Sequence, residues 1–112
     1  MPSPITSHVL DIANGKPAKG VSAVLEFFDG KNWNEIGRGI TNDDGRIRDL
    51  IPEPSILKKG IYRLTFDTAS YRKETPGFYP YIPIVFEIQQ TNQHYHIPLL
   101  LSPFGYSTYR GS

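Results

Sequence analysis

The sequence contains no cysteine among its 112 residues. This absence excludes disulfide frameworks, cysteine nucleophiles and thiolate zinc sites together, so the fold must be held by packing alone. The longest apolar segments are far too short to span a bilayer. The first residues have neither the basic start nor the apolar stretch of a signal peptide, and the last do not resemble a peroxisomal signal. We therefore expect a cytoplasmic protein without a membrane partner.

The sequence also has almost no excess of charge of either sign. The 12 Lys and Arg residues nearly balance the 11 Asp and Glu residues and leave a formal charge of +1. Because no long basic stretch occurs, we expect no nucleic-acid partner. Three common catalytic and nucleotide-binding signatures are missing as well: the Gly-x-Ser-x-Gly elbow, the Walker loop and the dinucleotide fingerprint.

What the sequence has in quantity is turn residues. Ten Gly and ten Pro divide it into short segments, which is typical of an all-β protein. We predict strands over residues 5–12, 21–28, 33–41, 46–51, 60–67, 82–88, 93–101 and 106–110. The segment 68–81 is ambiguous and has room for one short helical turn. Seven or eight strands without helical periodicity predict one domain over residues 1–112, folded as a β-sandwich or small barrel.

The histidines attract attention because they lie in strand-like segments. His94 and His96 are two residues apart, so on one strand they point to the same face. The opposite face is apolar enough to be the core side and carries Tyr95, Ile97, Leu99 and Leu101. The histidines then face outward beside Leu100, which indicates a covered surface or a subunit contact. From spacing alone, ordinary half-exposed histidines are the more common outcome.

Several other interpretations stay open at this point. A His-x-His pair fits a zinc site, with His8 or a carboxylate as third ligand, but the spacing singles out no third ligand. Arg46 follows the turn 42–45, where a side chain is held near a strand end yet stays reachable; ordinarily such an arginine lies on the surface. Arg48 points the same way in an extended segment, so spacing does not choose between the two. The tail 109–112 has the composition of a frayed terminus.

Five short segments, in order along the chain, resemble the 5-hydroxyisourate hydrolases, the enzyme branch of the transthyretin-like family. They are TSHVLD at 6–11, NGKPA at 14–18, TNDDGR at 41–46, HYHIPLLLSP at 94–103 and GYSTYRGS at 105–112. Each motif alone is weak, but five in the right order across the whole chain are a strong match. The ending Tyr-Arg-Gly-Ser discriminates best, because hormone-binding transthyretins share the sandwich but lack this ending and the histidine and arginine set.

The resemblance implies a transthyretin-like (prealbumin-like) sandwich of two sheets, with a short helix within 68–81. It also implies a homotetramer with active sites in the groove where dimers meet. The implied reaction is hydrolysis of 5-hydroxyisourate to 2-oxo-4-hydroxy-4-carboxy-5-ureidoimidazoline in urate degradation, with no cofactor and no metal. The alternative is a non-catalytic transthyretin-like protein that binds small molecules.

Carried over position by position, the resemblance places the catalytic residues at His8, Arg46, His96 and Ser112. It places the substrate-binding residues at His8, Arg46, Tyr109, Arg110 and Gly111. Arg48 is not the motif position, and His94 becomes a supporting neighbour. We expect one of His8 and His96 to activate water as general base and Arg46 to stabilise the oxyanion and orient the flat ring. Which histidine is the base stays open.

Overall fold

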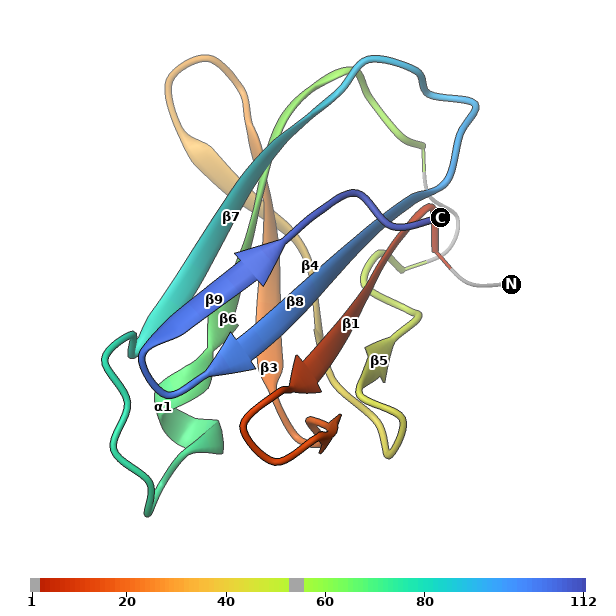
Figure 1. The fold of residues 1–112 in the computed structure, drawn as a ribbon. Helices are drawn as coiled ribbons and strands as arrows, with labels where there is room; N and C mark the ends of the chain where they lie inside the picture. Colours follow the sequence, from red (N-terminus) through yellow and green to blue (C-terminus); the bar gives the residue numbers. More distant parts are fainter. Residues whose placement is uncertain (1–2, 53–55) are drawn as a thin grey trace.

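Two facing sheets of short strands make up most of the computed structural model, which describes residues 3–52 and 56–112 (Figure 1). In chain order the elements are β1 (Ile5–Asp11), β2 (Lys16–Pro17), β3 (Ser22–Phe28), β4 (Trp33–Ile40), β5 (Arg46–Ile47), β6 (Gly60–Asp67), α1 (Thr68–Tyr71), β7 (Tyr81–Ile88), β8 (Tyr95–Ser102) and β9 (Gly105–Thr108). The predicted two-sheet sandwich with one short helix is therefore confirmed. The described residues form nine strands rather than seven or eight.

The first sheet has the strand order β2-β1-β8-β9, with β5 also paired to β1. Strands β1 and β8 run parallel, whereas β2 and β5 pair with β1 in antiparallel fashion. The second sheet has the order β4-β3-β6-β7 and is antiparallel throughout. In Figure 1 the strands β9, β8 and β1 lie in front of the second sheet. The parallel β1–β8 pair brings the start of the chain beside its last quarter.

The core lies between the sheets and is built from alternate residues of each strand. Its largest fully buried side chains include Ile5, Leu25, Leu50, Tyr62, Leu64, Phe66, Ile82 and Leu99. Burying each such side chain contributes roughly 1.5–3 kcal/mol, and this burial stabilises a fold that has no disulfide bond. The alternation predicted for β8 is confirmed, because Tyr95, Ile97, Leu99 and Leu101 are at most 6% exposed. The even-numbered positions of β8 therefore form the outer face of the first sheet.

One strand is additional to the prediction and another is shorter than predicted, each because of a contact with a neighbouring segment. Strand β2 arises where the predicted turn closes a hairpin and lays Lys16 and Pro17 against the end of β1; proline has no N–H to extend the ladder. Strand β5 ends at Ile47 instead of continuing to residue 51. The chain then crosses to β4, and the backbone of Leu50 lies directly against Gly37. A Cβ atom on Gly37 would lie only 1.7 Å from the carbonyl oxygen of Leu50.

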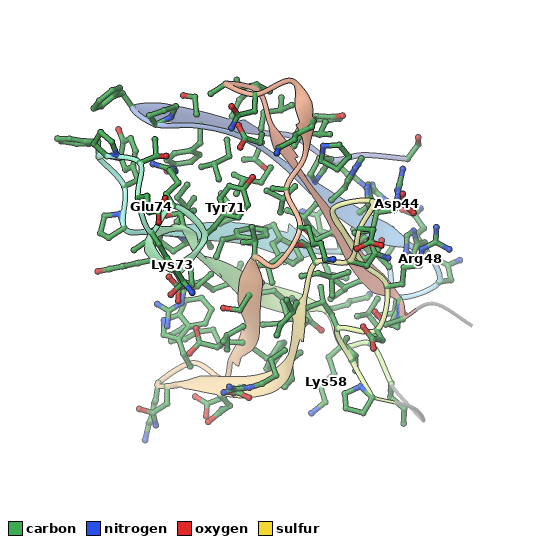
Figure 2. All side chains as sticks on the ribbon, turned by 90° about the horizontal axis from the view of Figure 1, so that it is seen from below. Asp44, Arg48, Lys58, Tyr71, Lys73 and Glu74 are labelled. Atoms are coloured by element: carbon green, nitrogen blue, oxygen red, sulfur yellow. The ribbon has the colours of Figure 1, made fainter. Side chains whose placement is uncertain are left out.

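The short helix α1 forms at the start of the ambiguous segment. The Asp67 side chain caps it by accepting a hydrogen bond of 3.1 Å from the Ser70 amide, as N-cap residues do. Figure 2 shows Tyr71 on this helix at one side of the molecule, and Asp44 and Arg48 around β5 at the other. Within the described ranges, no helix is long and apolar enough to cross a membrane.

Candidate active site

Strand register brings three predicted site residues together on the outer face of the first sheet. In the parallel β1–β8 pair, Thr6 lies opposite His96 and His8 lies opposite Pro98. In the antiparallel β1–β5 pair, Arg46 lies opposite His8. Side chains of paired residues share a face of the sheet. His8, Arg46 and His96, which come from three distant parts of the chain, therefore form one cluster.

Arg46 and His96 of this cluster line a small pocket beside the chain's end, and His8 lies next to His96. The ring centroids of His8 and His96 are 6.4 Å apart, with the ring planes tilted by 37°. A pocket of about 170 Å³ is lined by Thr6, Ser7, Arg46, Arg48, His94, His96 and Ser112. Figure 1 shows the C-terminal end lying next to the starts of β1 and β8. The structure thus places Ser112 with Arg46 and His96, as the resemblance implied.

Hydrogen bonds and a close-packed glycine in the turn before Arg46 fix the position of its backbone. The Asn42 Oδ1 atom accepts hydrogen bonds from the amides of Asp44 and Arg46, at 2.9 and 3.0 Å. Gly45 has a φ of +75°, and a Cβ atom there would lie 2.5 Å from the Val9 carbonyl oxygen. Glycine alone meets both conditions without strain. The turn therefore presses against β1 and delivers Arg46 next to His8.

The tail reaches the pocket through a close contact between Gly111 and His96. The Gly111 amide donates a hydrogen bond of 2.8 Å to the carbonyl oxygen of His96, and the two residues form an isolated antiparallel bridge. A Cβ atom on Gly111 would lie 2.6 Å from Cδ2 of His96 and 3.1 Å from Cγ of Pro98. A glycine is required here because the backbone lies directly on the imidazole ring. The segment is therefore attached to β8 and is not frayed.

The remaining tail residues are directed elsewhere. Tyr109 is 57% exposed. The Arg110 guanidinium lies 4.3 Å from the centroid of the Tyr95 ring and donates to Gln93 Oε1 at 2.9 Å. Both side chains line a second groove of about 320 Å³ between β7 and β8, and His96 lines it too. The structure therefore does not bring Tyr109 and Arg110 into the pocket of Arg46 and Ser112, although His96 borders both spaces.

Both site histidines favour the neutral form. Burial, followed by the positive charge of Arg46, lowers the pKa of His8 below 6.5, although the Asp44 backbone and carboxylate oppose the shift. Burial also lowers the pKa of His96, with further contributions from Arg46, His8 and His94. A neutral imidazole has a free nitrogen lone pair. At neutral pH the site therefore offers two candidate bases, His96 in the pocket and His8 next to it, close to the guanidinium of Arg46.

Two contributors could not be recognised in the sequence. The hydroxyl of Thr6 contacts both His94 and His96, and the Asp44 backbone raises the pKa of His8 against the effect of burial. The only sequence signal was that Thr6 precedes His8 by two residues and so shares its face. The contacts of Thr6 and Asp44 with the site histidines exist only because β8 and β5 lie beside β1. As for metal binding, residues 3–52 and 56–112 hold no group of three His, Asp or Glu side chains placed to bind an ion.

The sequence of this chain matches the model of the HIUase/Transthyretin family over residues 5–111. The chain belongs to this family. The resemblance drawn from the five motifs is thereby confirmed. Among curated members, the 5-hydroxyisourate hydrolase of Salmonella dublin is 48% identical over 110 residues, covering 96% of this chain and 80% of that protein. The mouse 5-hydroxyisourate hydrolase is 47% identical and covers 98% of this chain and 96% of its own length.

Solved structures of both branches of the family resemble this member. Sea bream transthyretin in complex with thyroxine superposes with a TM-score of 0.88 at 32% identity, over 97% of this chain and 95% of that one. The 5-hydroxyisourate hydrolase of Klebsiella pneumoniae gives 0.83 at 35% identity, over 96% and 97%. Backbone likeness alone therefore does not separate a thyroxine-binding transthyretin from a hydrolase, and the side chains of the pocket must decide.

Proposed function

We propose that this protein hydrolyses 5-hydroxyisourate by adding water to a ring carbonyl and breaking the adjacent C–N bond. The observation that carries the proposal is the cluster of His8, His96 and Arg46, in which Arg46 and His96 line one pocket and His8 lies next to both. Two neutral imidazoles beside a guanidinium supply the general base and the positive charge that attack of water on a carbonyl requires. Curated relatives that are 42–48% identical are named for this activity, which supports the same substrate here.

The histidines carry the proton transfers. One imidazole takes a proton from water while the water oxygen bonds to the ring carbonyl carbon. The resulting imidazolium then donates a proton to the ring nitrogen as the C–N bond breaks. Because burial and Arg46 lower the pKa of His8 and of His96, both rings are available as bases at neutral pH. His96 is the stronger candidate for the first step, because it lines the pocket with Arg46 and Ser112.

Arg46 supplies the positive charge that the reaction needs. Its planar guanidinium can bind oxygens of the flat substrate and stabilise the oxyanion that forms when water adds. Ser112 faces the same pocket, and Gly111 holds it there through its bond to His96. Tyr109 and Arg110 line the neighbouring groove with His96. We assign these two residues to substrate contacts on the far side of the His96 ring.

Assembly of four copies would complete the site. The pocket is shallow, since Arg48, His94 and Ser112 on its rim are exposed. Leu100, a half-buried apolar residue on the same outer face, is better suited to a subunit contact than to water. A tetramer with sites in the groove between dimers would cover Leu100 and wall the pocket, with the groove itself left open to substrate and water. Light scattering should then give four times the 12.7 kDa chain mass; a monomer would contradict this assembly. The cytoplasmic location stays a prediction.

The decay of 5-hydroxyisourate absorbance tests the activity directly. The substrate is generated fresh and followed with the protein, without it, and with an Arg46→Ala variant, because it also hydrolyses unaided. Acceleration by the protein alone supports the enzyme. No acceleration, together with saturable binding of small aromatic ligands, would indicate a transthyretin-like carrier. Neither activity nor binding would indicate a structural sandwich.

A further inference from the structure

The hydroxyl of Thr6 lies between two imidazoles on the outer face of the first sheet. Its Oγ1 atom is 2.8 Å from Nδ1 of His96 and 3.1 Å from Nε2 of His94. The rings of His94 and His96 are stacked, with centroids 6.4 Å apart. Thr6 is 6% exposed, whereas His94 is exposed. A buried hydroxyl therefore connects an imidazole of the pocket with an imidazole in contact with solvent.

The number of protons limits how these three groups can bond. A threonine hydroxyl has one proton, so it donates to one imidazole nitrogen and accepts from the other. In one arrangement, Nδ1–H of His96 donates to Thr6, and Thr6 donates to Nε2 of His94. In the other, both directions are reversed and His96 carries its proton on Nε2. Only the first arrangement leaves the Nε2 lone pair of His96 free to accept a proton from water.

We propose that Thr6 and His94 form a proton relay that holds His96 in its base-competent tautomer and conducts a proton to solvent. Nε2 of His96 takes a proton from the attacking water, and Nδ1 passes its own proton to Thr6 Oγ1. Thr6 passes its hydroxyl proton to Nε2 of His94, which releases a proton from Nδ1 to bulk water. One proton enters the relay and one leaves it. When the C–N bond breaks, the ring nitrogen takes the Nε2 proton of His96, and transfer through the relay in the opposite direction restores the start. This inference rests on the proposed function.

The chemistry of the reaction creates a need for such a path. Attack of water delivers a proton to Nε2 of His96, and departure of the ring nitrogen withdraws one, so a proton must move outward in the first step and inward in the second. Three charged or titratable groups besides His94 face His96, namely Arg46, Arg48 and His8. The positive charge of Arg46 opposes retention of a proton on His96. His94 offers an exit because it lies on the rim of the same pocket.

A set of threonine variants tests the positioning role of the hydroxyl. Thr6→Val keeps the shape of the side chain and removes the hydroxyl, Thr6→Ser keeps the hydroxyl, and Thr65→Val removes a half-buried threonine hydroxyl from the second sheet. Thr6→Val should lower kcat roughly 10- to 100-fold, as loss of an imidazole's orienting partner typically does. KM should change far less, Thr6→Ser should regain most of kcat, and Thr65→Val should match the wild type. Equal kcat values for Thr6→Val and Thr65→Val would overturn the relay.

Two measurements separate a relay from a merely structural contact. Long-range ¹H–¹⁵N NMR spectra of the wild type should show His96 protonated on Nδ1, and this preference should weaken in Thr6→Val. In His94→Asn, kcat should fall at low buffer concentration and recover as a small imidazole buffer is added, because the buffer replaces the exposed acceptor. An Nε2–H tautomer in the wild type would overturn the proposal, as would a buffer-independent kcat in His94→Asn. The tautomer is read without turnover, so it can be judged even if the wild type proves inactive, in which case the proposed function itself fails.

Discussion

Gly111→Ala should disable the site while leaving the sandwich folded. The new Cβ atom would lie 2.6 Å from Cδ2 of His96 and 3.1 Å from Cγ of Pro98. Neither neighbour can retreat easily, because His96 and Pro98 belong to β8, which is paired with β1 at both positions. The tail must therefore move outward. This movement breaks the 2.8 Å hydrogen bond from the Gly111 amide to His96 and carries Ser112 away from the pocket.

The expected losses of stability and activity differ widely. Losing one backbone hydrogen bond costs about 0.5–1.5 kcal/mol of unfolding free energy. Overpacking typically costs about 1–3 kcal/mol in a core, but little here because the neighbouring tail residues are exposed and can relax. A displacement of about 1 Å in a positioning residue can cost about 10²-fold in rate. We therefore expect kcat/KM to fall roughly a hundredfold with a stability loss of no more than about 1.5 kcal/mol.

A second glycine of the same hairpin provides the control. A Cβ atom on Gly105 would meet only Ser102 Oγ, at an ordinary 3.7 Å, so Gly105→Ala should preserve both activity and stability. The assay is 5-hydroxyisourate decay, paired with urea unfolding for each variant. If Gly111→Ala retained the turnover of Gly105→Ala, the tail would not close the site. A stability loss of more than about 3 kcal/mol would instead show that the contact belongs to the core.

Three further outcomes are expected. Arg46→Ala should lower kcat about 10²- to 10³-fold with an unchanged urea midpoint, and Arg48→Ala should have a smaller effect, because only Arg46 influences the pKa of both His8 and His96; equal losses would refute this choice. Since the pKa values of His8 and His96 lie below 6.5, the acid limb of kcat/KM should lie below pH 6.5 and unfolding free energy should fall as the pH drops through that region. An acid limb above 6.5 would contradict the role of the neutral rings. Turnover should persist after dialysis against a chelator; loss that zinc restores would support a metal site.

The strands could be predicted because their signals are local. The segment 60–67 has clear alternation and bounding turn residues, and the structure has β6 at these bounds. The same holds for the buried side of β8. Strand β5 could not be bounded in advance, because its end depends on the passage of Leu50 over Gly37 in another sheet. Local periodicity carries no information about such contacts between sheets.

The residues of the candidate site could likewise be predicted only in part. The residue types and the motif order led to His8, Arg46, His96 and Ser112; the structure places the last three around one pocket and His8 beside His96. Thr6 was not recognised, because its partners lie 88 and 90 residues away. The contact of the Arg110 guanidinium with the Tyr95 ring could not be predicted either, since a cation–π contact depends on the final position of both groups.

The sequence by itself determined three features of this protein. The core packs without disulfides, one strand carries an outward-facing histidine pair, and the last residues are typical of a hydrolase family. It determined these features because side-chain alternation and residue chemistry are properties of short segments. Only the tertiary structure decided that β1 and β8 run side by side in parallel, with Thr6 beside His96 and Arg46 beside His8. Parallel pairing joins distant segments, so its register follows from burial of the whole core and from no local signal.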